Sequence, residues 1–183
     1  CFAETHRIFT NSPVTKERLW RYNSRKSEVL YPPLNDEELF VPGPYGDYLF
    51  AGGRVAFGRR QDLLLEAMRL AGPECKLVIA GPCEDKACSE KLRSLIEQHD
   101  LVGRVKLQLR MHSRAEIADL ATNALACVYI PFQEDSLGYV TMEASAAARA
   151  VITTTDSGGL LEIVEDNKTG LVCEPSPQAL AHL

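Results

Sequence analysis

From Tyr48 onward, short apolar runs alternate with segments in which apolar residues recur every three or four positions. The short runs predict strands and the longer segments predict amphipathic helices. Expected strands are YLFAGG (48–53), KLVIAG (76–81), RVKLQL (104–109), LACVYI (125–130), AVITTT (150–155) and TGLVC (169–173). Expected helices are QDLLLEAMRLA (61–71), EKLRSLIEQHD (90–100), RAEIADLATNA (114–124) and YVTMEASAAA (139–148). This alternation predicts a three-layer α/β/α fold, and the almost wholly apolar strands indicate a parallel sheet covered on both faces.

Residues 1–47 have a different pattern. HRIFTNSPVTKERLWRYN (6–23) predicts a short strand and then a helix that Ser12 caps and Pro13 begins. VLYPPLNDEELFVPGPYGD (29–47) is rich in proline and glycine, which favours an extended connection. We therefore expect residues 1–47 to be the tail of one unit plus a linker, and residues 48–183 to be most of a Rossmann-like domain.

The two ends of the sequence suggest a fragment of a longer protein. The chain begins at Cys1 rather than Met, and it stops within SPQALAHL (176–183), where Ser176 is placed to cap a helix. We expect the second domain to be truncated at its C-terminus.

Charge and hydropathy narrow the class of protein. The 20 basic and 25 acidic residues give a net charge of −5 without a basic run, so the sequence lacks the footprint of a nucleic-acid partner. No apolar run approaches the ~20 residues of a membrane-spanning helix, and no secretory leader precedes the first element. These features predict a soluble, cytoplasmic protein.

The cysteines are predicted to be reduced thiols. Six are dispersed through a large apolar chain, and Cys127 and Cys173 lie in strand-like runs where cysteine acts as a small hydrophobe. Cys83 and Cys88 lie close together but have neither a second close-spaced pair nor a histidine nearby. A zinc site there is weakly indicated, and we expect no metal.

Ligands of open parallel sheets bind beyond the carboxyl ends of the strands, so each strand-to-helix junction is a candidate. In the first, GGRVAFGRR (52–60), Gly52 and Gly53 permit close backbone approach. Arg54, Arg59 and Arg60 could clamp a phosphate or diphosphate, because a guanidinium donates in pairs. The alternative is an arginine-rich loop that is only solvated.

The second and third junctions carry weaker signals. AGPCED (80–85) is either a ligand loop or only a tight turn. In RMHSR (110–114), Arg110 and Met111 could border a flat base, and Ser113 with Glu116 predicts a capping box. His112 is interpreted as a loop residue rather than a catalytic base. Neither G-x-G-x-x-G nor the P-loop pattern is present, which argues against an ordinary NAD or ATP site.

The fourth junction, YIPFQEDSLGYVTMEA (129–144), is the most informative. A helix is expected to start near Leu137 or Gly138, with the Gly138 and Tyr139 N–H groups free to bind a phosphate. Asp135 precedes that helix, and Glu143 could accept two hydrogen bonds from vicinal hydroxyls. Alternatively, Asp135 or Ser136 only caps the helix and Glu143 pairs with a surface cation.

The fifth junction is TTTDSGGLLEIV (153–164). It places Gly158 and Gly159 at an expected helix start, where a side chain would obstruct an approaching ligand. The alternative is a loop without a role in binding.

Several of these segments together resemble the nucleotide-sugar-binding half of a GT-B glycosyltransferase, in particular the retaining enzymes of glycosyltransferase family 4. NSPVTKERLWRY and EVLYPPL resemble the end of the acceptor domain and its linker, and GGRVAFGRRQDLLLEAM resembles the Gly-Arg loop. RVKLQL through YVTMEA resembles the segment that ends in the E-x7-E motif, and AVITTTDSGGLLEIVEDNKTGLV resembles the region after it.

Three positions depart from the family pattern. The motif is D-x7-E, because seven residues separate Asp135 from Glu143 and Glu134 is one position out of register. Arg59 replaces the lysine of the Gly-Arg loop, and Ala150-Val151 stand where a proline is common. Aspartate keeps the charge on a side chain one methylene shorter, which puts the donor-sugar geometry in question.

The resemblance implies a donor-binding half of a retaining glycosyltransferase that acts on a glycan or lipid-linked acceptor. Arg54 and Arg59 would hold the donor diphosphate in place of a metal and stabilise its leaving charge, and with Asp135 they are the implied catalytic residues. The implied nucleotide-sugar contacts are Gly53, Arg54, Arg59, Arg110, Met111, Asp135, Ser136, Leu137, Gly138, Tyr139 and Glu143. No cofactor is expected.

The implied partners are a nucleoside-diphosphate sugar, the missing N-terminal acceptor domain and, for the full-length protein, a membrane surface. The fragment alone is expected to be inactive. Two other classes remain open: half of a GT-B-like epimerase or phosphorylase, and a non-catalytic nucleotide-binding module. A phosphorylase would need a lysine for its covalent cofactor, and no lysine stands at a junction near the motif.

Overall fold

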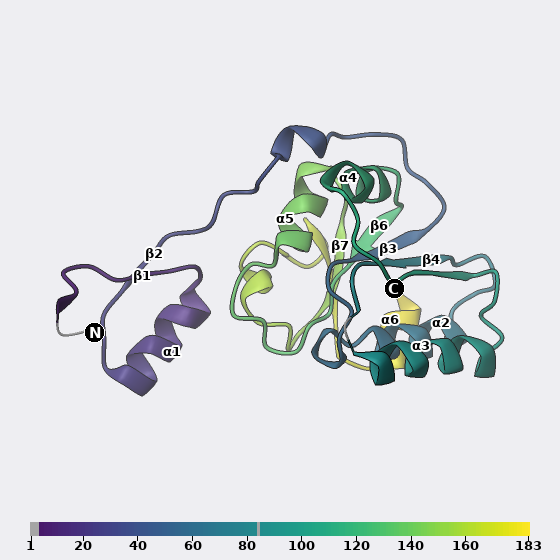
Figure 1. Cartoon of the computed structure of the whole chain (residues 1–183), viewed down its shortest axis with the longest axis horizontal. Coiled ribbons are helices and arrows are strands. Elements are labelled where there is room, and N and C mark those ends of the chain that lie inside the picture. Colours follow the sequence, from purple (N-terminus) through teal and green to yellow (C-terminus); the bar gives the residue numbers. More distant parts are fainter. Residues whose placement is uncertain (1–3, 84) are drawn as a thin grey trace.

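The computed structural model describes residues 4–83 and 85–183, and their strands form two separate parallel sheets (Figure 1). The small sheet pairs β1 (Phe9–Thr10) with β2 (Glu28–Val29). The large sheet contains β3 (Leu49–Gly52), β4 (Leu77–Ala80), β5 (Val105–Gln108), β6 (Ala126–Val128), β7 (Val151–Thr154) and β8 (Gly170–Cys173).

The large sheet has the strand order β5-β4-β3-β6-β7-β8, and all neighbouring strands are parallel. From β3 the chain first builds outward through β4 and β5. It then returns to the other side of β3 with β6. This reversal creates a crevice at the carboxyl ends of β3 and β6, the switch point where open α/β sheets bind ligands.

Helices cover both faces of the large sheet (Figure 1). The helices α2 (Gln61–Leu70), α3 (Lys86–Gln98) and α6 (Pro177–His182) lie on one face, and α4 (Arg114–Thr122) and α5 (Tyr139–Ala146) lie on the other. Each face has its own apolar core. The predicted fold class, a Rossmann-like three-layer α/β/α parallel sheet, is confirmed.

The central strands β3, β4 and β6 are mostly buried, as their apolar composition predicts. All residues of β4 are buried, and Leu77 and Ile79 are at most 1% exposed. Burying such a side chain stabilises the fold by about 1.5–3 kcal/mol. Strand burial therefore accounts for the rigidity of the platform from which the carboxyl-edge loops extend.

Local capping signals set several helix boundaries. Ser12 accepts from the Thr15 N–H at the start of α1 (Pro13–Asn23), Ser113 and Glu116 form the predicted capping box, and Ser176 caps α6. The helix α3 begins at Lys86, four residues before the predicted Glu90. Its first turn is stabilised by the Asp85 carboxylate, which accepts from the backbone N–H groups of Ala87 and Cys88.

Residues 4–47, here called the N-terminal arm, contain α1, the small sheet and a connection with a single 3-10 turn at Glu37–Leu39. The connection is extended as predicted, but it is anchored to the large domain. Phe40 is 2% exposed within the core, and the buried Arg149 donates to the carbonyls of Gly43 and Pro44.

The described cysteines Cys75, Cys83, Cys88, Cys127 and Cys173 are free thiols, and Cys1 lies outside the described residues. Cys127 is buried, and desolvation raises the pKa of its thiol to about 12. Cys127 therefore acts as the small core hydrophobe that its strand position predicts. Within residues 4–83 and 85–183, no helix is long and apolar enough to cross a membrane.

Candidate functional site

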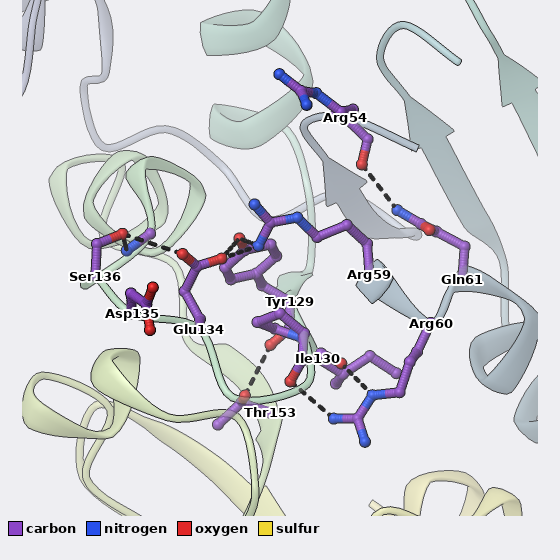
Figure 2. Close-up of polar contacts among 12 residues, drawn as sticks. Arg54, Arg59, Arg60, Gln61, Tyr129, Ile130, Glu134, Asp135, Ser136 and Thr153 are labelled. Atoms are coloured by element: carbon purple, nitrogen blue, oxygen red, sulfur yellow. Dashed lines mark hydrogen bonds and ion pairs between the residues drawn. The ribbon is translucent and has the colours of Figure 1, made fainter. Parts of the chain in front are cut away.

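The loop after β3 brings two of the predicted arginines to the switch point. Gly53 has a φ of +96°, and a Cβ there would lie 3.0 Å from the Val140 side chain of α5. Arg54 is exposed, and its side chain makes no hydrogen bond or ion pair with any residue that the structure describes. Its carbonyl accepts from Gln61 Nε2 at 3.2 Å (Figure 2). The loop is thus held through its backbone and leaves the Arg54 guanidinium available.

Arg59, at the end of the 3-10 helix Phe57–Arg59, points toward the loop after β6 (Figure 2). Its guanidinium forms an ion pair with Glu134 and donates to the Tyr129 hydroxyl. The Tyr129 hydroxyl in turn donates to Glu134 Oε2 at 2.9 Å. Burial raises the pKa of Tyr129, so the phenol stays protonated and serves as a donor at neutral pH. Arg59 is therefore already paired with an anion of the chain itself.

Arg60 points the opposite way and fastens the loop after β6 from below (Figure 2). It donates to the carbonyls of Ile130 and Pro131 and to Thr154 Oγ1 at 2.7–2.8 Å, and it pairs with both oxygens of Asp156 at 2.9 Å. Arg60 has a φ of +55°, an uncommon conformation for a residue other than glycine. Arg60 is therefore a positioning residue rather than an anion ligand.

The fourth junction differs from its prediction in detail. The helix α5 begins at Tyr139, with Gly138 as its cap at a φ of +71°. The prediction that the Gly138 N–H is free is wrong, because it donates to Ser136 Oγ at 3.3 Å. Neither Asp135 nor Ser136 occupies the cap position. Leu137 is buried, whereas the Tyr139 side chain is half-exposed.

Asp135 follows Glu134 in the same loop, but it contacts the N-terminal arm. Its carboxylate pairs with Arg18 of α1, and its carbonyl accepts from the hydroxyls of Ser12 and Thr15, the latter at 3.1 Å. The side chain remains 57% exposed. The first acid of the D-x7-E pattern is thus placed where the arm meets the large domain, and its contact with a donor sugar stays a prediction.

Glu143 is buried within α5, and its carboxylate pairs with Arg114 at the start of α4. Arg114 also donates to the carbonyl of Asn35 at 2.8 Å, and its guanidinium stacks 4.8 Å from the Phe40 ring centroid. Sequence reasoning missed Arg114, since nothing in its local pattern distinguishes it from other surface arginines. A cation pairing with Glu143 was anticipated only as the alternative to ribose binding.

The third junction is ordered by contacts among its own residues. Arg110 pairs with Glu116 at 2.5 Å, and this hydrogen bond lowers the pKa of Glu116 to about 2. His112 contacts the Arg110 carbonyl and Gln108 Oε1 through its two ring nitrogens, as expected of a loop residue. Met111 is 74% exposed. The role of Arg110 and Met111 beside a base stays a prediction.

The glycine pair of the fifth junction is explained by contact with another loop. Gly159 starts a 3-10 helix, Gly159–Glu162, and its N–H donates to the Glu134 carbonyl at 2.7 Å. A Cβ on Gly158 would lie 2.4 Å from that carbonyl oxygen. The close approach of the chain's own residues 133–136 accounts for this glycine, and access for a ligand stays a prediction.

The structure thus brings Arg59 together with Glu134 and Tyr129, whereas Arg54 has no partner among the residues that it describes. Glu143, Arg110 and Asp135 each have other partners. Sequence reasoning missed Tyr129, which lies in an apolar run, and treated Glu134 only as out of register. Within the part of the chain that the structure describes, no cluster of three or more His, Cys, Asp or Glu side chains could hold a metal ion.

The sequence matches known proteins over most of its length. It is 29% identical to the mouse protein named alpha-1,3/1,6-mannosyltransferase ALG2, over 93% of this chain and 47% of that protein. The chain therefore spans about half the length of the curated relatives it matches. It is also 32% identical to alpha-maltose-1-phosphate synthase of Mycolicibacterium smegmatis, over 66% of this chain and 31% of that protein.

Solved structures share the fold. The Anabaena protein Alr3699/HepE, in complex with UDP and glucose, superposes with a TM-score of 0.85 at 19% identity, over 96% of this chain and 52% of that one. The sequence model of the family described as "Glycosyl transferases group 1" matches residues 43–183. Because that match covers most of the chain and the whole switch-point crevice, the chain belongs to the glycosyl transferases group 1 family.

Proposed function

We propose that this chain is the donor-binding half of a retaining glycosyltransferase, which moves a sugar from a nucleoside-diphosphate sugar to a glycan or lipid-linked acceptor. The observation that carries the proposal is the pair of arginines that follows β3 at the switch point of a Rossmann-ordered sheet, of which Arg54 has no partner among the described residues. Cations that converge on this crevice suit a diphosphate. Family membership supports the same class of reaction.

In this function the chain's residues act mainly by electrostatics. Arg54 and Arg59 bind the diphosphate and stabilise the charge that develops on the leaving nucleoside diphosphate. This role of two guanidinium groups leads us to propose that no metal ion is required. Glu143 accepts from the ribose hydroxyls, which requires that its carboxylate share its hydrogen-bonding capacity with Arg114.

The remaining contacts are assigned by position in the motif. Asp135 and the backbone from Ser136 to Tyr139 would contact the donor sugar and phosphate, Gly53 would allow close approach, and Arg110 and Met111 would border the base. Asp135 also pairs with Arg18 of the arm, so donor binding and arm position are expected to influence one another.

The acceptor site is proposed to lie on a second half that these residues do not include, since the chain spans about half of its curated relatives. The isolated chain is then expected to bind a donor and to turn over little. We further propose a cytoplasmic location, at the membrane face where the acceptor is lipid-linked.

The test is calorimetric titration and thermal unfolding of the 183-residue chain with UDP, GDP, ADP and their sugar forms, with and without magnesium. The mannosyltransferase name of one relative and the UDP bound to another place mannosyl and uridine donors first. Ligand at ~100 times its dissociation constant should add about 2.7 kcal/mol of stability. Binding without magnesium that is lost in Glu143→Gln but kept in Glu97→Gln supports the proposal.

Glu97→Gln is the matched control because Glu97 is an exposed acid in the last turn of α3, outside the strand-to-helix junctions. If no nucleoside diphosphate stabilises the chain at millimolar concentration, the donor-binding function fails and a non-catalytic role takes its place. If binding requires magnesium, the metal-independent role of the two arginines is wrong.

A further inference from the structure

Glu134 holds a carboxylate directly against the expected diphosphate ligand Arg59. Besides the ion pair with Arg59, its Oε2 accepts from the Tyr129 hydroxyl at 2.9 Å and its Oε1 accepts from Ser136 Oγ at 3.3 Å. The Glu134 side chain is only 15% exposed. The carboxylate therefore has the kind of partners that a bound phosphate would take: a guanidinium and two hydroxyl donors.

The backbone of Glu134 is held in position by hydrogen bonds to the loop after β7. Its N–H donates to the Ser157 carbonyl at 3.0 Å, and its carbonyl accepts from the Gly159 N–H at 2.7 Å. Residues 134 and 158 form a parallel bridge, and Gly158 leaves no room between the two segments. Rotation of the Glu134 side chain can therefore release Arg59 while the loop itself stays in place.

The two arginines of the crevice consequently differ in electrostatic state. Arg54 is exposed and has no partner among the described residues, whereas Arg59 is 32% exposed and neutralised by Glu134. A partly buried guanidinium without a counter-ion is costly, so the pair stabilises the empty site. An incoming diphosphate must compete with this carboxylate for Arg59, and it experiences repulsion from it until the side chain rotates away.

We propose that Glu134 is an internal counter-ion that occupies the anion position on Arg59 and is displaced by the diphosphate of the ligand. This inference rests on the proposed function for the identity of the ligand. The consequence is that Glu134 weakens diphosphate binding. It thereby determines affinity and favours release of the nucleoside diphosphate, because the carboxylate can return to Arg59 as the product leaves.

The test compares wild type with Glu134→Gln, which keeps the shape of the side chain and removes its charge. Affinities for inorganic pyrophosphate, UDP and GDP are measured by titration calorimetry. Glu134→Gln should bind pyrophosphate about tenfold more tightly, since the ligand no longer competes with a carboxylate for Arg59. Glu165→Gln makes the same change in net charge on an exposed acid paired with Lys168, ahead of β8, and should leave the affinity unchanged.

Two further variants test whether the gain in pyrophosphate affinity depends on Arg59 and on the position of the Glu134 charge. In an Arg59→Gln background, adding Glu134→Gln should produce no gain beyond that of Glu165→Gln, because the competition requires Arg59. Glu134→Asp moves the carboxylate away from Arg59 by one methylene and should give a pyrophosphate affinity between those of wild type and Glu134→Gln. This variant can be compared with wild type even if Glu134→Gln does not fold.

Unchanged or weaker pyrophosphate binding in Glu134→Gln would overturn the proposal and make Glu134 a residue that only orients Arg59. A gain in pyrophosphate affinity from Glu134→Gln that persists in the Arg59→Gln background would also overturn the proposal. If UDP or GDP binds wild type while no gain follows the substitution, the donor-binding function survives and the counter-ion inference fails. If pyrophosphate binding tightens but no nucleoside diphosphate is preferred over it, the inference stands and the proposed function fails.

Discussion

The Arg59 guanidinium and the Glu134 carboxylate form an ion pair that joins the loop after β3 to the loop after β6. These loops leave neighbouring strands at the switch point of the sheet, so the pair spans the crevice where a ligand is expected. Arg54, five residues before Arg59, has no such partner among the described residues. Substitutions of the two arginines should therefore have different consequences.

Arg54→Ala is expected to weaken nucleoside-diphosphate binding without changing the fold. The guanidinium makes no hydrogen bond or ion pair within the described chain, so its removal leaves no buried group unsatisfied. Losing one charge-assisted interaction of about 1.5–3 kcal/mol corresponds to a loss of roughly 10- to 150-fold in affinity. Calorimetry with UDP and GDP measures the affinity, and urea unfolding should show a stability within about 0.5 kcal/mol of wild type. An unchanged affinity would remove Arg54 from the site.

Gly138→Ala should disturb the crevice through Tyr129. A Cβ at this position would lie 2.5 Å from Tyr129 Cε1, at a backbone φ of +71° that disfavours alanine. We expect a loss of about 1–3 kcal/mol in the free energy of unfolding, together with weaker anion binding, because Tyr129 supports both Arg59 and Glu134.

Gly58→Ala is the matched control for this substitution. Gly58 lies beside Arg59 in the 3-10 helix, and a Cβ there meets nothing within 4 Å. Its stability should be unchanged or rise by about 0.4–1 kcal/mol. Equal losses in the two variants, measured by urea unfolding, would show that the Tyr129 contact is not the cause.

Arg60→Ala and Arg60→Gly separate the effect of losing the side-chain hydrogen bonds from the effect of the positive φ at this position. Both remove the hydrogen bonds to Ile130, Pro131, Thr154 and Asp156, so both should destabilise the fold by about 2–3 kcal/mol. Alanine also keeps the unfavourable φ of +55°, which glycine adopts freely. Arg60→Gly should therefore be more stable than Arg60→Ala by about 1 kcal/mol in urea unfolding. The reverse order would mean that the backbone relaxes once the side chain is gone.

The Arg60–Asp156 pair should contribute to the acid sensitivity of the fold. Hydrogen bonding from Arg60 is the main cause that holds the pKa of Asp156 below its usual value of 3.8. Because the folded-state pKa lies below the unfolded one, the stabilisation is fully present above the unfolded pKa. It is lost as the pH falls through the folded pKa. Asp156→Asn should lower stability at pH 7 and reduce the decline between about pH 5 and pH 3. Urea unfolding over this range measures both slopes, and identical slopes would contradict the prediction.

Much of the fold follows from patterns within short segments. Apolar runs and helical periodicity identified the strands and helices of the large sheet, because burial on one or both faces repeats at the spacing of each element. Caps were equally local: Ser12, Ser113 and Ser176 each accept a hydrogen bond within three residues. The start of α3 was misplaced because Asp85 was not recognised as a cap and Cys88 was not counted in the apolar stripe that it shares with Leu92.

Contacts between segments that are distant in the sequence could be identified only from the tertiary structure. Arg59 meets Glu134 across 75 positions, and Arg114 meets Glu143 across 29, so neither pairing has a signature at any fixed spacing. Gly158 was recognised as a special position, yet its close contact with the carbonyl of Glu134 was visible only in the tertiary structure. The sequence by itself determined which edge of the sheet carries the polar loops. Only the order of the strands, together with the geometry of side chains at that edge, decided that Arg59 is paired with Glu134 while Arg54 has no partner among the described residues.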